Sequence, residues 1–324
     1  MNIVLQMSIV IAAMRSIEWT FTKRPLRRYE FPEGRDSPVE RPLSVSNVLI
    51  DSFDLLCNQQ GIGWSWSLNP FPRESLSTPP SSIASIWAKT LLKIMLVDVS
   101  QYAMQSICPS IDKPGGGSLF DPTLPLSSRT SLGALAAIFG GVWVYAVIDS
   151  LYHASMLIGR HLLLQPASHW PPLFRRPWMA TSIRDFWSNR WHQSLRHVLV
   201  VFGARPGGKL LGRAGAVMGA FAVSAFIHYL GLWGTGHGTD FRIDGGFFLL
   251  MGVGAIMEGA FQRATGLRVG GWLGWLWTMS WTLMWGTFWI DGWARRGIFA
   301  ANFFPGRRRP GKMLVDGAVS LFST

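Results

Sequence analysis

Residues 131–148 read SLGALAAIFGGVWVYAVI and contain no aspartate, glutamate, lysine or arginine. An uncharged apolar run of this length predicts a transmembrane α-helix. Residues 214–239 and 269–290 form two further runs without these charged residues, and the second of them holds six tryptophans. A helix satisfies its backbone hydrogen bonds internally, as lipid requires. The three runs therefore predict an all-α, polytopic integral membrane helical bundle.

Two more segments, residues 82–107 and 245–261, are predominantly apolar but carry charged side chains. Each is close to the length of a membrane span. The apolar residues 1–14 are too short for a complete span and predict a partial one. Together, these segments predict about five to seven transmembrane helices.

Three carboxylates lie within or beside these apolar runs, namely Asp98, Asp149 and Glu258. A charge in hydrocarbon is costly unless it faces protein or a water-filled cavity. We expect each of the three to be a polar group that faces the bundle or stands at a helix end.

The composition is typical of a membrane protein. Of the 324 residues, 48% are hydrophobic and 15% are charged, whereas a soluble domain has about 25% charged residues. The net charge of +12 does not indicate nucleic-acid binding, because the basic residues lie in loops between apolar runs. Such loops suit the anionic headgroups of the cytoplasmic leaflet, or an acidic cosubstrate. We therefore expect a lipid bilayer as partner, and no nucleic acid.

Cysteine and histidine spacing argues against the common metal sites. Two cysteines cannot form a disulfide framework or a Cys-rich zinc site. The seven histidines show no H-E-x-x-H spacing, and no G-x-S-x-G nucleophile elbow occurs. We expect neither a bound metal nor a serine acyl-enzyme.

The longest hydrophilic stretch is residues 165–213, where eight basic residues accompany one acid, Asp185. By the positive-inside rule this stretch is cytosolic. We interpret residues 1–324 as a single membrane-embedded domain with this basic cytosolic loop. In the middle of the loop, residues 184–193 read RDFWSNRWHQ, a dense cluster of aromatic, charged and titratable side chains.

This cluster is predicted to lie on a short amphipathic helix. Upstream prolines exclude a continuous helix, so the helix begins near residue 183, with Thr181 or Ser182 as its cap. Spacings of four and three residues then put Asp185, Asn189 and His192 on one helix face.

Two interpretations of the cluster compete. Trp187 and Trp191 can belong to an aromatic belt at the membrane interface, anchored by the neighbouring arginines. A second histidine, His228 in FAVSAFIHYLGLW, favours a functional site, because it lies near the middle of an uncharged run. A histidine there is either an interhelical hydrogen-bond donor or a group suited to general-base chemistry near neutral pH.

Three stretches together carry a resemblance to a known family. They are WPPLF with RPWMATSIRDFWSNRWHQ in residues 170–193, SAFIHYLG in residues 224–231, and NQQGIGWSWSLNP in residues 58–70. The chain resembles the wax-synthase-like branch of the membrane-bound O-acyltransferases (the MBOAT superfamily), and within it the fungal enzymes that acetylate terpenoids and meroterpenoids. The resemblance extends from about Leu55 to the last apolar run, and the N-terminal segment is shorter than the family implies.

The resemblance implies both a fold and an activity. The fold is a multi-helix membrane bundle around a chamber, which acyl-CoA enters from the cytosol and a lipophilic alcohol enters from the bilayer. The activity is transfer of acetyl from acetyl-CoA to a hydroxyl of a terpenoid or meroterpenoid, in the endoplasmic reticulum membrane. A long-chain acyl-CoA:alcohol acyltransferase of the wax-synthase type is the alternative.

The resemblance also implies roles for the two histidines. The family's intramembrane histidine corresponds to His228, which would act as general base. Its polar partner corresponds to His192. Because Ser188 and Asn189 replace the Gly-Arg that relatives commonly carry, Asn189 is the other candidate for the partner.

The arginines of the same cluster are the expected binding site for the cosubstrate. Arg184, Arg190 and Arg196 would contact the CoA phosphates, with Trp187 and Trp191 beside them. Snorkelling of these arginines to lipid headgroups is the structural alternative.

Two other functions compete with acyl transfer. Residues 203–209 have the G-x-x-x-x-G-K spacing of a phosphate-binding loop, but Leu210 stands where that loop needs a serine or threonine for magnesium. A membrane transporter would also explain polar residues inside spans, although the sequence shows none of the paired repeats with broken helices that many transporters have.

Overall fold

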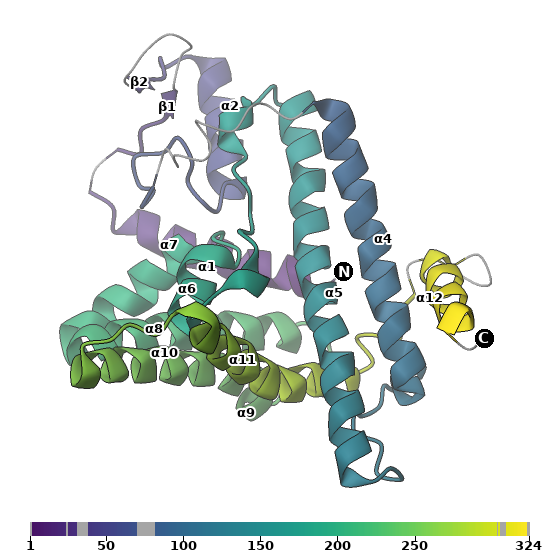
Figure 1. The fold of residues 1–324 in the computed structure, drawn as a ribbon. Coiled ribbons are helices and arrows are strands. Elements are labelled where there is room, and N and C mark those ends of the chain that lie inside the picture. Colours follow the sequence, from purple (N-terminus) through teal and green to yellow (C-terminus); the bar gives the residue numbers. More distant parts are fainter. Residues whose placement is uncertain are drawn as a thin grey trace.

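The computed structural model describes residues 2–23, 25–30, 38–69, 82–302, 304 and 309–322, and these residues are predominantly helical (Figure 1). Their β structure consists of a two-stranded antiparallel ribbon, β1 (Tyr29–Glu30) with β2 (Val39–Glu40), and one isolated bridge. The prediction of an all-α helical bundle is therefore confirmed.

Each apolar run of the sequence falls largely on one of the long helices. The long helices are α1 (Asn2–Thr20), α2 (Val45–Cys57), α4 (Ile83–Ile107), α5 (Leu126–His161), α8 (Arg205–Trp233), α10 (Gly246–Thr265), α11 (Gly271–Ala294) and α12 (Pro310–Phe322). The short helical segments between them are η1 (Pro109–Asp112), η2 (Ala167–His169), η3 (Pro177–Met179), α6 (Ile183–Asp185), η4 (Phe186–Arg190), α7 (Arg196–Leu199), η5 (Val200–Ala204) and α9 (Phe241–Asp244).

Within the described residues, four helical segments are long and apolar enough to cross a membrane: Ile3–Thr20, Leu126–His161, Arg196–Trp233 and Phe241–Thr265. α4 and α11 are also long, at 25 and 24 residues. However, α4 carries three charged side chains, and α11 carries seven tryptophans, which lower its mean hydropathy. The described residues thus contain four helical segments that meet both criteria and two further long helices that do not. The sequence predicts about five to seven spans.

The N-terminal span is longer than predicted. The sequence predicts a partial span over residues 1–14, but α1 continues to Thr20. The added residues include two charges that find partners. Arg15 pairs with Glu18 at 2.5 Å, and Glu18 lies 2.8 Å from Nε2 of His197. Because these charges are compensated within the protein, they do not end the helix.

The helices form two groups that meet at a shared core. α4 and α5 run side by side, and α12 packs against α4 (Figure 1). α8, α10 and α11 run across the direction of that pair, and α1 packs against α8. α11 contacts α5 where the groups meet, and buried side chains such as Met104, Phe248 and Ile290 form one hydrophobic cluster there.

α8, together with α7 and η5 that precede it, forms a hairpin with two legs. Its backbone leaves the helical conformation at Leu211 and Gly212, and Gly212 has a φ of +60°. The leg formed by residues 196–210 folds back against the leg formed by residues 213–233. The closest approach joins pairs of glycines, position 203 with 219 and position 207 with 215. Glycines allow two helix backbones to approach this closely.

The hairpin argues against the phosphate-binding-loop alternative and shows where the irregular part of the hydrophilic stretch ends. Residues 203–209, which have the spacing of a phosphate-binding loop, lie inside helical segments and do not connect a strand to a helix. Their glycines serve helix packing. The hydrophilic loop predicted over residues 165–213 ends at Leu195, because residues 196–210 are helical and pack against the second leg of α8.

The three carboxylates in apolar surroundings are buried and face other parts of the protein, as predicted. Asp98 accepts a hydrogen bond from Nε of Arg309 at 2.7 Å. Asp149 pairs with Lys93 at 3.0 Å. Glu258 accepts from the N-terminus of α6. Each carboxylate therefore joins two elements: α4 to the start of α12, α5 to α4, and α10 to α6.

Glu258 fixes the start of the segment that carries the aromatic cluster. Its Oε1 accepts from the amide of Ile183 at 2.6 Å and from the indole of Trp277 at 3.0 Å, and its Oε2 accepts from the amide of Arg184 at 3.1 Å. Ser182 caps the same turn, as predicted, by accepting an amide hydrogen bond at 2.9 Å. A carboxylate is favourable here because the first amides of a helix lack partners within the helix.

We predict that Glu258→Ala destabilises the protein. The change leaves two amides and one indole without their acceptor, and an unsatisfied buried donor costs about 1–3 kcal/mol. Thermal unfolding in detergent should show a lower Tm, and limited proteolysis should cut faster between α5 and α7. Glu258→Gln is the matched control, because it keeps one carbonyl oxygen and should lose less. Equal stability of wild type and Glu258→Ala would contradict this role.

Candidate active site

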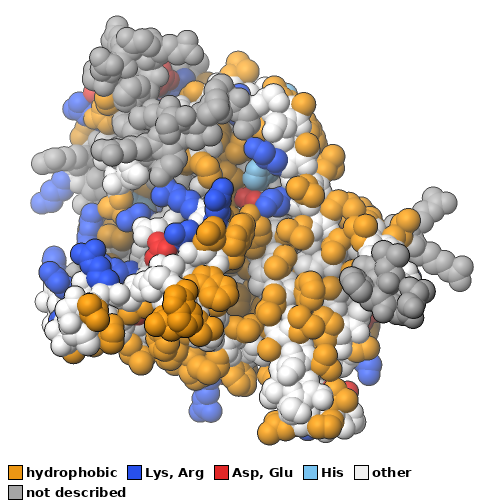
Figure 2. All heavy atoms as spheres, viewed as in Figure 1, with side chains coloured by type: hydrophobic (Ala, Val, Ile, Leu, Met, Phe, Trp, Pro, Cys, Tyr) orange, Lys and Arg blue, Asp and Glu red, His pale blue; other side chains and the backbone are white. Residues whose placement is uncertain are grey.

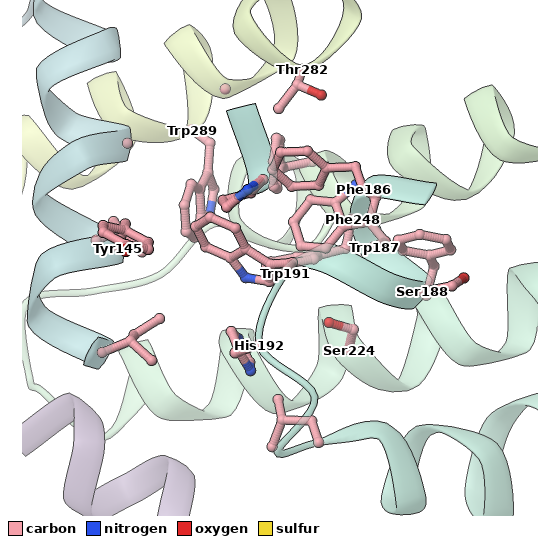
Figure 3. Close-up of a pocket in the computed structure, with 18 of the residues that line it drawn as sticks. Tyr145, Phe186, Trp187, Ser188, Trp191, His192, Ser224, Phe248, Thr282 and Trp289 are labelled. Carbon is pink, nitrogen blue, oxygen red and sulfur yellow. The ribbon is translucent and has the colours of Figure 1, made fainter. Parts of the chain in front are cut away.

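A cavity of about 980 Å³ lies between α5, α8, α10 and α11, and residues 184–200 close one side of it. Most of its lining side chains are apolar, and many are aromatic. Figure 3 shows Trp187, Trp191 and Trp289 close together, with His192 beside them. The volume falls in the range of about 300–1,000 Å³ that is typical of small-molecule sites.

His228 lies on the second leg of α8 and lines this cavity. Its Nδ1 lies 2.7 Å from the carbonyl oxygen of Ser224. A carbonyl oxygen can only accept, so Nδ1 carries the proton and Nε2 carries the lone pair. The imidazole also stacks on Phe248, with 4.0 Å between the ring centroids. His228 is therefore held in the tautomer that can take a proton through Nε2.

His192 lines the same cavity, but it does not lie on the predicted helix face. α6 widens into the π-helix η4, where the amide of Trp191 bonds five residues back to the carbonyl of Phe186 at 2.8 Å. The backbone is extended at Trp191, so the helix has ended before His192 is reached. The prediction that Asp185, Asn189 and His192 share one helix face is wrong for this reason.

The surroundings of His192 favour a neutral imidazole. Burial, followed by the nearness of His228, lowers the pKa of His192 to about 3. Nδ1 of His192 lies 2.9 Å from Oγ of Ser194, and either atom can be the donor. When Ser194 donates, Nε2 of His192 carries the proton and can donate a hydrogen bond. The cavity then holds one imidazole that accepts and one that donates.

Asn189 is not brought to the cavity. Its side chain is exposed, and its Nδ2 donates to Oδ1 of Asp185 at 3.2 Å. The other oxygen of Asp185 accepts from Nε of Arg190 at 2.5 Å. Of the two candidate partners of His228, His192 is the one that lines the cavity.

Trp187 and Trp191 pack against other aromatic side chains of the protein, which favours their interpretation as part of a site. Trp187 lies edge-on to Phe221 of α8 and Phe247 of α10, with centroids 6.1 and 6.0 Å apart. Trp191 stacks on Phe186 at 5.4 Å. Both indoles line the cavity, where they form part of its aromatic wall.

The arginines predicted to bind CoA occupy different positions. Arg184 and Arg196 are exposed and line the cavity. Arg190 is bound to Asp185 and lies outside the cavity lining. Arg184 also borders a second, more polar cavity of about 520 Å³. The two cavities therefore share one arginine.

The second cavity contains two arginines that the sequence reasoning missed. Arg213 stands at the start of the second leg of α8, and Arg268 lies in the connection from α10 to α11. Both are exposed, and Figure 2 shows lysine and arginine side chains gathered over this part of the molecule. Arg213 directly precedes the uncharged run that begins at residue 214, and Arg268 directly precedes the one that begins at residue 269. That position at the end of an apolar run is the sequence feature that could have identified them.

Two further histidines, the buried His197 and the half-buried His169, have structural partners. Nε2 of His197 lies 2.8 Å from Glu18, and this pair ties α7 to α1. Nδ1 of His169 accepts from Arg28 at 3.1 Å. Burial and the charge of Arg28 lower the pKa of His169 to about 4. Among the described residues, no group of three or more histidine, cysteine or acidic side chains has the arrangement to hold a metal ion.

Residues 170–250 match the sequence profile of the membrane bound O-acyl transferase family. An O-mevalon transferase of Aspergillus niger is 25% identical over 174 residues, which are 51% of this chain and 38% of the relative. An acetyltransferase of Arthrobotrys oligospora is 24% identical over 228 residues, 63% of this chain and 44% of the relative. A long-chain-alcohol O-fatty-acyltransferase of Simmondsia chinensis is 30% identical over 106 residues, 30% of each chain.

The chain covers less than two thirds of the length of each of these relatives. The segment that matches the family profile begins in the loop before His192 and ends beyond His228. It thus contains both histidines that line the cavity. The profile match over residues 170–250, the relatives and the helical architecture together support placing the chain in the membrane-bound O-acyltransferase family.

Proposed function

We propose that this chain transfers an acetyl group from acetyl-CoA to a hydroxyl of a lipophilic terpenoid or meroterpenoid, in the endoplasmic reticulum membrane. The observation that carries the proposal is that His228 and His192 line one predominantly apolar cavity. Apolar walls suit a lipophilic alcohol, and two imidazoles can supply a proton acceptor and a hydrogen-bond donor. The acetyltransferase names among the relatives support the same class of reaction.

The reaction needs only the two substrates and the two histidines. Nε2 of His228 takes the proton of the acceptor hydroxyl while the hydroxyl oxygen attacks the thioester carbon. A C–O bond forms, and the negative charge on the former carbonyl oxygen accepts a hydrogen bond from Nε2–H of His192. When the carbonyl re-forms, the C–S bond breaks and the CoA thiolate takes the proton from His228. The products are the ester and CoA thiol, with both histidines restored.

The second cavity supports a position for the phosphate end of the cosubstrate. Arg184 borders both cavities, and Arg213 and Arg268 face the second one. Glu258 also borders this cavity, but its oxygens already accept from amides and an indole. Guanidinium groups bind phosphate through paired, charge-assisted hydrogen bonds. We therefore assign the phosphates to Arg184, Arg213 and Arg268.

A long-chain acyl donor is the second candidate, because one relative is a long-chain-alcohol O-fatty-acyltransferase. A transporter is the third. Release of free thiol from acetyl-CoA or from palmitoyl-CoA, measured with a panel of terpenoid alcohols, distinguishes the three. Thiol from acetyl-CoA supports the proposal, and thiol from palmitoyl-CoA alone supports the wax-synthase type. Movement of ligand across vesicles without thiol release would support transport.

His228→Ala should abolish transfer without unfolding the protein. General-base catalysis contributes about 10²–10⁴-fold to a rate, so we expect a loss of this size in kcat for thiol release. Membrane insertion and Tm should stay close to wild type. Full activity of His228→Ala would overturn the assignment of the base.

His192→Asn should keep part of the activity, whereas His192→Ala should lose more. The asparagine amide can still donate a hydrogen bond to the developing oxyanion, and one such donor is worth about 10²–10³-fold in kcat. Asn189→Ala, compared side by side, should be close to wild type because Asn189 faces away from the cavity. If Asn189→Ala instead loses as much as His192→Ala, the partner role belongs to Asn189.

Arg213→Gln and Arg268→Gln should each raise the KM for acyl-CoA. Loss of one charged hydrogen bond costs about 1.5–3 kcal/mol, which corresponds to roughly tenfold or more. The effect should shrink for a donor that lacks the 3′-phosphate, and in high salt. Arg263→Gln is the matched control, since Arg263 is exposed on α10 but does not line the second cavity. An unchanged KM in both variants would remove these arginines from the CoA site.

A further inference from the structure

The wall of the large cavity that α4 and α5 form carries a polar pair that the proposed chemistry does not use. Nζ of Lys93 donates to the hydroxyl oxygen of Tyr145 at 2.9 Å and lies 3.0 Å from Oδ2 of Asp149. Lys93 and Tyr145 both line the cavity, whereas Asp149 is buried behind them. The pair therefore presents polar atoms to a space that is otherwise largely apolar.

Charge compensation explains only part of this cluster. Two charges buried in lipid compensate each other, so the pairing of Lys93 with Asp149 has a sufficient structural reason. Tyr145 is not needed for that. Its oxygen accepts from an ammonium group, so its own O–H remains available to donate. No acceptor for this O–H lies among the described residues, and the group borders the cavity. An oxygen of a molecule that fills the cavity is placed to accept this hydrogen bond.

The ammonium group also makes the tyrosine a better donor. A hydroxyl whose oxygen accepts one hydrogen bond is polarised and donates a stronger one. Nζ of Lys93 lies 4.4 Å from the centre of the Tyr145 ring, so the positive charge stays beside the phenol. In a low-dielectric cavity, a single strong donor is enough to orient a lipophilic ligand.

The position of Tyr145 is fixed relative to the reacting groups. Its ring packs against Phe174, 4.6 Å between centroids, and against Trp178 at 6.0 Å. Phe174 in turn lies 6.0 Å from the ring of His192. One phenylalanine ring therefore separates Tyr145 from His192. Figure 3 shows Tyr145 extending from α5 toward the aromatic side chains of the site.

We propose that Tyr145, polarised by Lys93, is a second anchor for the acceptor alcohol. Its O–H donates to an oxygen of the acceptor that is remote from the hydroxyl to be acylated, such as a second hydroxyl or a ketone. This inference rests on the proposed function and deepens it. The acceptor class becomes rigid lipophilic alcohols that carry two oxygen functions, and simple long-chain alcohols become poor acceptors.

Two rigid probes that differ by one oxygen test the anchor. Androstanediol has a hydroxyl group at each end of its ring system, and androstanol lacks the distal one. Binding to the purified full chain in detergent can be followed by quenching of tryptophan fluorescence, because Trp187, Trp191 and Trp289 line the cavity. We expect the wild type to bind the diol about tenfold more tightly than the mono-alcohol, the worth of roughly one buried hydrogen bond. In Tyr145→Phe this preference should fall to near unity.

The diol and the mono-alcohol partition differently into detergent. This difference cancels when the diol-to-mono-alcohol affinity ratio of Tyr145→Phe is compared with that of the wild type. Tyr152→Phe is the matched control, because Tyr152 lies on the same helix, donates to the carbonyl of Pro171 at 2.5 Å, and does not line the cavity. Its preference for the diol should equal that of the wild type. If Tyr145→Phe proves too unstable to assay, the double variant Lys93→Met with Asp149→Asn keeps the hydroxyl but removes its charged neighbour. That variant should lower the preference about threefold.

A wild type without preference for the diol, or a Tyr145→Phe variant that keeps the full preference, would overturn the anchor. Failure of the anchor and failure of the proposed function are distinguishable, because binding is measured without turnover. Thiol release that depends on His228, together with a diol preference that does not depend on Tyr145, would remove only the anchor. A Tyr145-dependent preference without thiol release from any acyl-CoA would remove only the acyl transfer.

Discussion

Hydrocarbon offers no hydrogen-bond partner, so a charged group on the long helices is costly unless it finds a partner inside the protein. The buried carboxylates show how this constraint shapes the fold. Asp98 binds Arg309 at the start of α12, Asp149 binds Lys93 across the α4–α5 pair, and Glu258 binds the first amides of α6. None of these contacts lies within a single helix. Each of these three carboxylates therefore joins two elements.

The same constraint sets the chemical state of the site. Nδ1 of His228 is satisfied by the carbonyl of Ser224, four residues earlier on the same helix, and His153 makes the equivalent contact with the carbonyl of Asp149 at 2.7 Å. A helix thus selects the tautomer of a histidine on its own surface, with no second residue required. For His228 this leaves Nε2 as the acceptor in a cavity wall. The position of His192 depends on more contacts. The cap at Ser182, the hydrogen bond from Ile183 to Glu258 and the π-turn of η4 together place His192 in the wall of the same cavity.

The parts of the fold that could be predicted are those that depend on local composition. Uncharged runs predicted the long helices, and the preference of Ser182 for a helix cap predicted where α6 begins. His228 stood out as a histidine inside an uncharged run and His192 as part of an aromatic, titratable cluster, whereas their proposed roles came from a resemblance between the surrounding motifs and a family. The π-turn was not predictable from spacing, because the helical periodicity that links residues 185, 189 and 192 fails once one hydrogen bond skips to the fifth residue. Tyr145 carried no signal, since an aromatic residue inside an apolar run is unremarkable without knowledge of its neighbours.

The hairpin of α8 was equally hidden, because its turn depends on one glycine in an apolar, glycine-rich stretch. Residues 196–210 form a leg of about 22 Å at 1.5 Å per residue, whereas the hydrocarbon core of a bilayer is about 30 Å thick. The turn carries Lys209 and Arg213, which suit the headgroup region. The other end of this leg, next to His192, then reaches only part of the way across the hydrocarbon core. The bilayer has to thin locally, or the helices have to tilt, to accommodate the short leg. Under the proposed function, bilayer thickness thereby becomes a variable for the site, and sterol-rich and sterol-poor membranes should present an alcohol to different depths of the same protein.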